Sequence, residues 1–272
     1  EAPGPDESNI TPFLLSMVGA ITRACAARGY DLLMSFQQLS SNWHVDFEDS
    51  RKADGILLLG YGDDHLSRAR LAALDAQGTH FVRWGAVRDG QPGITIGCDN
   101  AAGGRDVTAH LLGLGRRRIA FIGAATDHYP EFEDRFTGYS AALAAAGLAV
   151  DPLLQLDAIA TEAAGFDATN ALLARGVAFD AVFAASDLIA IGALRALHAA
   201  GLRTPDDVAV AGFDDLPAAA MANPPLTTVA QDVARGGAAL VGALLDRIEN
   251  RDVGDRLLPA RLVVRKSCGA AA

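Results

Sequence analysis

The chain has 272 residues, half of them apolar and 21% charged, and its 23 basic and 33 acidic side chains give a net charge of −10. This length suggests one or two domains of about 100–200 residues each, and the acidic charge argues against a nucleic-acid-binding surface within these residues. No apolar run reaches the roughly 18 residues of a transmembrane helix, and three widely spaced cysteines favour a reducing, cytoplasmic setting over a disulfide framework.

Helix and strand patterns alternate along the chain. A first helical pattern of apolar residues, from Leu14 to Cys25, is expected to end at Gly29. Short apolar runs then predict strands at 31–36, 55–60, 80–84, 118–123, 180–185 and 208–213. Helix-length segments lie between them, at about 64–77, 101–113, 134–146, 164–175, 187–200 and 235–249. This alternation predicts an α/β fold with parallel sheets covered by helices on both faces.

About ten strand candidates are too many for one open sheet, so two smaller sheets in two lobes are expected. The chain opens with a helix, whereas a βα series opens with a strand, which suggests a first strand upstream of Glu1. In the helix predicted at 187–200, one apolar stripe recurs every three residues and consists of Leu188, Ile191, Leu194 and Leu197.

Motifs of the common catalytic and metal sites are absent from the sequence. It contains no HExxH, CxxC, GxSxG or GxxxxGK[ST] pattern, and its six histidines show no metal-ligand spacing. The GLGRRR run at 113–118 has two glycines of a dinucleotide fingerprint, but it lacks the third and follows a helix instead of a strand. Gly113 and Gly115 are better interpreted as a helix end, with arginines near its negative pole. We therefore expect no catalytic residue, no metal and no cofactor.

Polar and aromatic residues gather after the predicted strands, where open α/β sheets bind their ligands. They are Tyr61, Trp84, Arg135, Ser186 with Asp187, Asp214 with Asp215, and Gln231 with Asp232. If two sheets face each other across a cleft, these residues surround one cavity. The set suits a neutral sugar, because aromatic faces cover its C–H patches and charged groups bind its hydroxyls.

Each of these residues also has a structural interpretation. Ser186 or Asp187 is suited to cap the following helix. Arg135 can pair with Glu131 or Asp134 on its own helix, and the tryptophan can belong to the core. No single residue is therefore decisive. A binding site is favoured because all of these residues follow the ends of predicted strands.

Five segments in order carry a family resemblance. They are GCDNAAGGRDVTAHLLGLGRRRIAFIG at 97–123, RFTGY at 135–139, FAASDLIAIGALRALHAAGLRTPDDVAVAGFDDL at 183–216, PPLTTVAQD at 224–232 and LPARLVVRKSC at 258–268. Their order, their spacing and the PLTTV-x-QD and LP-x-LV-x-R ending resemble the effector-binding core of the LacI/GalR (lactose/galactose repressor) family of bacterial transcription regulators.

The resemblance implies a two-lobed, periplasmic-binding-protein-like (type I) fold, each lobe a mostly parallel sheet flanked by helices. The N-terminal lobe is expected at 1–96 plus 232–257, and the C-terminal lobe at 97–231 plus 258–272.

The residues at the family's effector-contact positions are Trp84, Arg135, Ser186, Asp214 and Gln231. The Thr-Pro-Phe-Leu run at 11–14 resembles the family's Asn-Pro-Phe-Phe start and adds Phe13 as a second stacking face. Thr11 and Ser186 depart from the asparagines found in family members, so no relative supplies the identity of the effector.

By this resemblance the chain is the effector-binding and dimerisation domain of a DNA-binding transcription regulator, without catalysis. A mono- or disaccharide is expected to change the lobe arrangement and so the affinity for operator DNA. The family's helix-turn-helix headpiece, which contacts the DNA, is absent from these residues. We expect a cytoplasmic homodimer without membrane contact.

Two other functions remain as alternatives. A periplasmic sugar-binding protein of a transporter shares the fold and is preceded by a signal peptide. A sugar-modifying enzyme with Asp214 as its base lacks a partnered acid, a metal site and a phosphate loop in this sequence.

Overall fold

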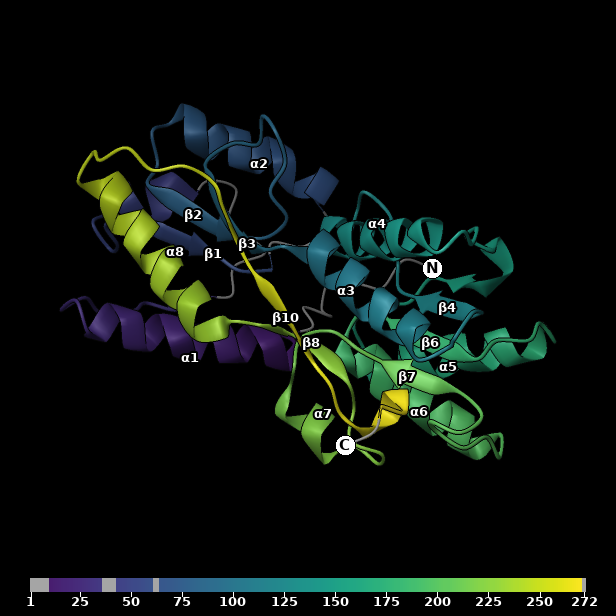
Figure 1. Cartoon of the computed structure of the whole chain (residues 1–272). Coiled ribbons are helices and arrows are strands. Elements are labelled where there is room, and N and C mark those ends of the chain that lie inside the picture. Colours follow the sequence, from purple (N-terminus) through teal and green to yellow (C-terminus); the bar gives the residue numbers. More distant parts are fainter. Residues whose placement is uncertain (1–9, 36–42, 61–63, 271–272) are drawn as a thin grey trace. The chain divides into compact units, whose positions relative to one another are not determined.

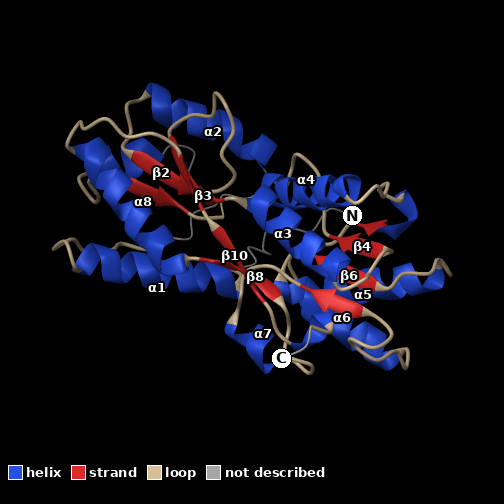
Figure 2. Ribbon diagram, in the orientation of Figure 1, coloured by secondary structure: helices blue, strands red, loops and turns tan. Residues whose placement is uncertain are grey.

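The computed structural model describes residues 10–35, 43–60 and 64–270. The chain forms two compact units, Glu1–Cys98 with Asp232–Leu258 (unit 1) and Asp99–Gln231 with Pro259–Ala272 (unit 2). In each unit helices flank strands (Figure 2), which confirms the α/β class. Within the described residues, no helix is long and apolar enough to cross a membrane.

Unit 1 is built on a parallel sheet in the order β1-β2-β3-β9. Its strands are β1 (Ile56–Leu58), β2 (Phe81–Trp84), β3 (Ile94–Cys98) and β9 (Arg256–Leu258). The central strands β2 and β3 are buried along their whole length, as expected where helices cover both faces of a parallel sheet.

The helical elements of unit 1 are α1 (Pro12–Ala26), α2 (Asp64–Ala76), α8 (Val233–Ile248) and the short π-helix η1 (His44–Asp49). Thr11 caps α1 by accepting the backbone N–H of Leu14. Although α1 and α8 come from distant parts of the chain, they lie side by side (Figure 1). Gly237 makes this approach possible, because a Cβ there would lie 2.7 Å from the Cβ of Ala20.

The strand predicted at 31–36 is wrong for residues 31–35, which have no regular secondary structure, and Phe36 lies outside the described residues. The apolar side chains of Leu32, Leu33 and Met34 are exposed. An apolar run becomes a strand only where a neighbouring strand satisfies its backbone groups. Among the described residues no strand pairs with this segment.

Unit 2 contains a parallel sheet in the order β5-β4-β6-β7 and a separate antiparallel pair, β8 with β10. Its strands are β4 (Ile119–Ile122), β5 (Gln155–Leu156), β6 (Ala181–Ala184), β7 (Ala209–Ala211), β8 (Thr228–Gln231) and β10 (Ala260–Val263). Every residue of β4, β6 and β7 is buried, so these strands form the centre of the unit 2 core.

The helical elements of unit 2 are α3 (Asn100–Gly113), α4 (Pro130–Ala145), η2 (Pro152–Leu154), α5 (Glu162–Ala174), α6 (Asp187–Ala199), α7 (Pro217–Met221) and η3 (Lys266–Cys268). Helix α3 packs against α4, and α5 against α6. The α3–α4 contact is close: a Cβ at Gly104 would lie 2.2 Å from the carbonyl oxygen of Arg135. This contact fixes the helix that carries Arg135.

Two local predictions in unit 2 have different outcomes. Helix α3 ends at Gly113, Gly115 has a φ of 89°, and Arg117 Nη1 donates to the Leu112 carbonyl oxygen over 2.9 Å, so the helix-end interpretation is confirmed. The helix predicted at 187–200 is found as α6, but its apolar stripe is buried only at Leu194 and Leu197, and Leu188 and Ile191 are half-buried. The helix is buried more broadly, through small residues that the apolar stripe omitted, such as Ala190, Ala193 and Ala196.

Candidate functional site

Three of the predicted effector-binding residues form one network in unit 2. Asp214 Oδ1 lies 3.7 Å from Arg135 Nη1 and accepts a hydrogen bond from Gln231 Nε2 over 2.7 Å. Arg135 comes from α4, Asp214 follows β7, and Gln231 is the last residue of β8. The fold therefore brings together a cation, an anion and an amide that lie far apart in the sequence.

Arg135 points into unit 2 and contacts other elements. Its Nε donates to Asn100 Oδ1 over 2.9 Å, and its Nη1 donates to the carbonyl oxygen of Ala185. The guanidinium carbon lies 3.8 Å from the centre of the Phe213 ring, a cation–π contact. The alternative that Arg135 pairs only with acidic residues on its own helix is therefore wrong. Sequence reasoning missed Asn100, whose only signal was its place at the start of α3, two residues after the end of β3.

Ser186 has the structural role that its sequence position also suggested. Its Oγ accepts the backbone N–H of Ile189 over 3.3 Å, which caps α6. The preceding carbonyl, of Ala185, accepts from Arg135. Ser186 is thus buried next to the network, although its hydroxyl already has one partner within α6.

Asp187, which the sequence placed either in the ligand cavity or at the cap of α6, links three segments of unit 2. Its Oδ2 accepts the backbone N–H of Leu216 over 2.7 Å, and its Oδ1 accepts the hydroxyl of Thr228 over 2.5 Å. The side chain is fully buried. It therefore joins the start of α6 to the loop after β7 and to β8, which no local sequence pattern indicates.

The loop after β7 has an unusual backbone at two consecutive residues. Asp214 has a φ of 118° and Asp215 a φ of 54°, values that residues with a side chain rarely adopt. Such conformations cost on the order of 1–3 kcal/mol each and persist where surrounding contacts hold them. The two carboxylates have different partners, because Asp215 Oδ1 pairs with Arg265 Nη2 over 2.6 Å. Asp215 is thus held by an ion pair outside the network.

Burial controls the protonation of both buried carboxyl groups. It raises the pKa of Asp214 to about 6, against the opposing effects of the Arg135 charge and the Gln231 hydrogen bond. Burial, together with the charge of Asp214, also raises the pKa of Asp187 well above its usual range, against the hydrogen bonds from Thr228 and Leu216. Asp187 and Asp214 therefore bind protons more readily than exposed carboxylates do.

The two aromatic candidates, Phe13 of α1 and Trp84 of β2, contact each other in unit 1. Their ring centroids are 6.1 Å apart and their planes are inclined by 42°. Both side chains are buried. A Cβ at Gly236 of α8 would lie 2.9 Å from the Trp84 ring, so part of that ring packs on the helix. The structure therefore brings these two residues together within unit 1, as it does Arg135, Asp214 and Gln231 within unit 2.

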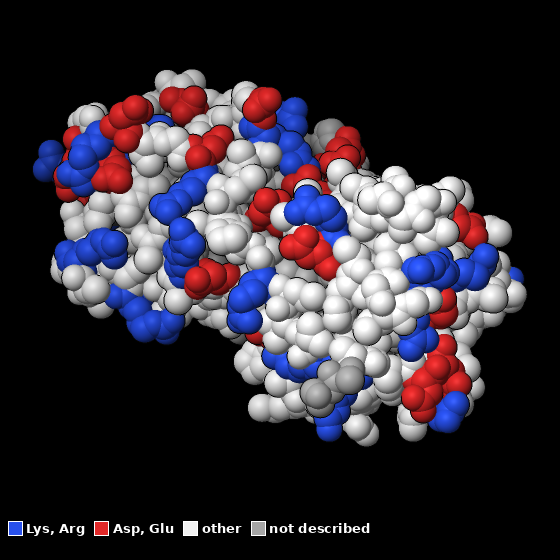
Figure 3. Space-filling model, viewed as in Figure 1, with Lys and Arg blue, Asp and Glu red and all other residues white. Residues whose placement is uncertain are grey.

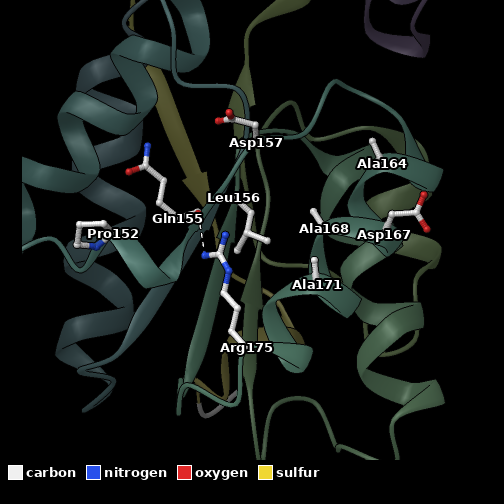
Figure 4. Close-up of a pocket in the computed structure, with 9 residues that line it drawn as sticks. All are labelled: Pro152, Gln155, Leu156, Asp157, Ala164, Asp167, Ala168, Ala171 and Arg175. Carbon is white, nitrogen blue, oxygen red and sulfur yellow. Dashed lines mark hydrogen bonds between the residues drawn. The ribbon is translucent and has the colours of Figure 1, made fainter. Parts of the chain in front are cut away.

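A separate groove of about 610 Å³ lies between β5 and α5 (Figure 4). It is lined by Pro152, Gln155, Leu156, Asp157, Ala164, Asp167, Ala168, Ala171 and Arg175, none of them a predicted effector-binding residue. Arg175 Nη1 donates to the carbonyl oxygen of Gln155 (Figure 4) and also to that of Leu153. Arg175 thereby satisfies carbonyl oxygens at and just before β5, the edge strand of the unit 2 sheet.

The Arg135–Asp214–Gln231 network offers hydrogen-bond donors and an acceptor side by side. A sugar hydroxyl can donate to a carboxylate and accept from a guanidinium or an amide, which makes the arrangement suitable for neighbouring hydroxyls. Among the residues that the structure describes, no group of three His, Cys, Asp or Glu side chains is placed to hold a metal ion.

Comparisons with known proteins identify the family. Residues 108–268 match the periplasmic binding protein-like domain family. The HTH-type transcriptional regulator CelR of Thermobifida fusca is 36% identical over 259 residues, which span 93% of this chain and 73% of the relative. The chain belongs to the LacI family of transcriptional regulators.

A further relative of this LacI-family chain and a solved structure of CelR agree with the assignment. The ribose operon repressor of Escherichia coli K12 is 31% identical over 244 residues, which span 89% of the chain and 73% of the relative. The solved complex of the transcriptional regulator CelR with cellobiose has a TM-score of 0.84 and 35% identity, and the match covers 94% of this chain and 79% of that one. These relatives are regulators of transcription, which favours the regulator over the transporter and enzyme alternatives.

Proposed function

We propose that this LacI-family chain binds a mono- or disaccharide effector and dimerises, as the sensing part of a regulator that binds operator DNA. The observation that carries the proposal is the Arg135–Asp214–Gln231 network, in which charged and amide groups converge on one point in a largely buried setting. Charge-assisted hydrogen bonds of this kind are the stronger ones in proteins. They suit the neighbouring hydroxyls of a sugar.

The residues that we propose to bind the effector are Phe13, Trp84, Arg135, Ser186, Asp214 and Gln231. We further propose that the lobes of this regulator are 1–96 plus 232–257 and 97–231 plus 258–272. Support for a sugar comes from the solved cellobiose complex of a relative. The rings of Phe13 and Trp84 are the kind of surface that covers the C–H face of a pyranose.

Operator binding is proposed to require a helix-turn-helix headpiece, which these residues do not include. On the face that Figure 3 shows, basic side chains are interspersed with acidic ones. The sequence carries a net charge of −10, whereas a duplex-binding domain usually gathers basic residues into one stripe. Effector binding is proposed to change the conformation of a cytoplasmic homodimer and so its operator affinity.

A thermal melt of the chain against a panel of sugars tests this proposal. The panel begins with cellobiose, ribose, glucose and galactose; free adenine serves as a non-sugar control and glucose 6-phosphate as a charged sugar control. A ligand at about 100 times its dissociation constant stabilises the fold by about 2.7 kcal/mol. We expect one sugar to raise the melting temperature selectively. A shift with adenine alone, or none with any sugar across a broad panel, would contradict a sugar effector.

A further inference from the structure

Asp187 holds the chain on both sides of the strained Asp214–Asp215 pair. Its backbone N–H donates to the carbonyl oxygen of Phe213 over 2.7 Å, and its Oδ2 accepts the backbone N–H of Leu216 over 2.7 Å. Phe213 is the residue immediately before the pair and Leu216 the residue immediately after it. One residue at the start of α6 therefore fixes both ends of a segment with two positive φ angles.

The second oxygen of the Asp187 carboxylate ties the same segment to β8. Oδ1 accepts the hydroxyl of Thr228 over 2.5 Å, and Thr228 Oγ1 accepts the backbone N–H of Asp215 at 3.4 Å. Gly212 leaves the space that this carboxylate occupies, because a Cβ there would lie 2.4 Å from Oδ1. Side-chain and backbone groups of Asp187 thus act together on one loop.

We propose that Asp187 is a positioning residue for the effector: it holds the loop at 213–216 so that the Asp214 side chain meets Arg135 and Gln231. This inference rests on the proposed function for its biological meaning, but its structural part does not. Positive φ angles at residues with side chains need surrounding contacts to persist, and Asp187 supplies such contacts to both ends of the strained pair. A residue with only a stabilising role would leave the Asp214–Gln231 contact unchanged when removed.

Asp180 provides a matched control for this proposal. Its carboxylate also accepts two hydrogen bonds, here both from backbone N–H groups, of Arg117 over 2.8 Å and of Arg118 over 3.0 Å. It stands directly before β6, whereas Asp187 stands beyond the other end of that strand. Asp180→Ala therefore removes a comparable pair of hydrogen bonds and leaves the loop at 213–216 with all its partners.

The first test needs no effector. The side-chain amide resonances of Gln231 in an ¹⁵N NMR spectrum report its hydrogen bond to Asp214, and Gln231→Ala assigns them. We expect Asp187→Ala to move these resonances toward their positions in Asp214→Ala. Asp187→Asn, which keeps an acceptor for the Leu216 N–H, and Asp180→Ala should leave them near the wild-type positions. Unmoved Gln231 resonances in a folded Asp187→Ala would overturn the proposal.

Thr228→Val carries the same test if Asp187→Ala does not fold. Valine has nearly the shape of threonine but lacks the hydroxyl that links Asp187 to the backbone of Asp215. The Gln231 resonances should move in the same direction and by less. No movement in Thr228→Val would then count against the proposal.

The second test is a double-mutant cycle in affinity for the sugar that the thermal panel identifies. We expect Asp187→Ala to weaken binding about tenfold in the wild-type background, the effect of losing one well-placed charged hydrogen bond. In an Asp214→Asn background it should weaken binding no further. Equal losses in both backgrounds would contradict action through Asp214. If no sugar binds while the Gln231 resonances move as expected, the proposed function fails and the positioning role remains.

Discussion

Gln231 donates its side-chain amide to the Asp214 carboxylate over 2.7 Å, although Gln231 ends β8 and Asp214 lies in the loop after β7. An isolated parallel bridge between Asp214 and Ala230 brings the backbones of the two segments together, and Asp214 donates its N–H to the carbonyl oxygen of Val229. The amide therefore orients a carboxylate whose own backbone is strained. That combination of strain and convergence is typical of binding sites.

Because the backbone at Asp214 is strained, glycine should be more stable than alanine at this position, the reverse of the usual order. Asp214→Gly should be more stable than Asp214→Ala by about 1 kcal/mol, because glycine adopts a φ of 118° without steric cost. Urea unfolding of both variants measures this difference. At Asp180, which is not among the positive-φ residues, alanine should be more stable than glycine, since glycine loses more entropy on folding. An Asp214→Gly variant no more stable than Asp214→Ala would show that the loop is not strained.

Stability should depend on pH through Asp214. Its pKa is raised from the ordinary value of 3.8 to about 6 in the folded protein, so folding takes up a proton between these values. The stability from this group is present in full below about pH 4 and is lost as pH rises through about 6. The charge of Arg135 opposes this shift. The pKa of Asp187 is also raised, so its carboxyl group likewise stabilises the folded protein more at low pH than at high pH.

Urea unfolding at two pH values measures this effect. On going from pH 7 to pH 5, the wild-type protein should gain about 1 kcal/mol of unfolding free energy relative to Asp214→Asn. The comparison with Asp214→Asn removes the contributions of carboxyl groups that do not interact with Asp214, whereas that of Asp187, whose pKa the Asp214 charge raises, is counted with Asp214. A constant difference between the two proteins would mean that Asp214 has an ordinary pKa.

Effector affinity should change with pH in the opposite sense. A sugar that binds the ionised form of Asp214 must displace the proton that this group holds below about pH 6. Its dissociation constant should therefore rise about tenfold between pH 7 and pH 5. Isothermal titration calorimetry at both pH values measures it, and Asp214→Asn should show little change. An equal pH dependence in the variant would assign the effect to another group.

Two glycines of α3 should respond in opposite ways to alanine. A Cβ at Gly104 would lie 2.2 Å from the carbonyl oxygen of Arg135, so Gly104→Ala should lower the unfolding free energy by roughly 1–3 kcal/mol and displace α4. Gly113 at the end of the same helix has no neighbour within 4 Å of such a Cβ. Gly113→Ala should be neutral or stabilising by up to about 1 kcal/mol. Similar effects at both positions would argue against the close α3–α4 contact.

Intrinsic fluorescence tests the unit 1 part of the proposed site. The chain has two tryptophans: Trp84 contacts Phe13, and Trp43 lies 4.8 Å from the guanidinium of Arg70. If Trp84 binds the effector, the sugar found in the thermal panel should change its emission. This change should persist in Trp43→Phe and disappear in Trp84→Phe. A change that survives in Trp84→Phe would remove this tryptophan from the site.

The sequence predicted the elements whose signals are local. The alternation of apolar runs and helix-length segments is enough to indicate β4, β6 and β7 with α5 and α6 between or beside them, because buried parallel strands are continuously apolar. The helix end at Gly113 was also predictable from local residues, because Gly115 and the arginines that follow lie next to it. The network residues were placed by their positions after strands and by the family resemblance.

Contacts between distant segments were not predictable in this way. Residues 31–35 are apolar enough for a strand, but a strand also depends on a partner elsewhere in the chain. Arg135 has acidic neighbours in its own helix, yet Asn100, Ala185 and Phe213 determine where it points. Asp187 resembled a helix cap because its hydrogen-bond partners lie 29 and 41 residues away.

The central claim is that the Asp214 carboxylate binds a sugar, and calorimetry on two matched variants tests it most directly. Asp214→Asn and Asp215→Asn make the same change at adjacent residues, one in the network with Arg135 and Gln231 and the other paired with Arg265. At pH 7, Asp214→Asn should weaken binding of the sugar from the thermal panel about tenfold or more, and Asp215→Asn should stay within about threefold of wild type. Unchanged affinity in a folded Asp214→Asn would contradict the account.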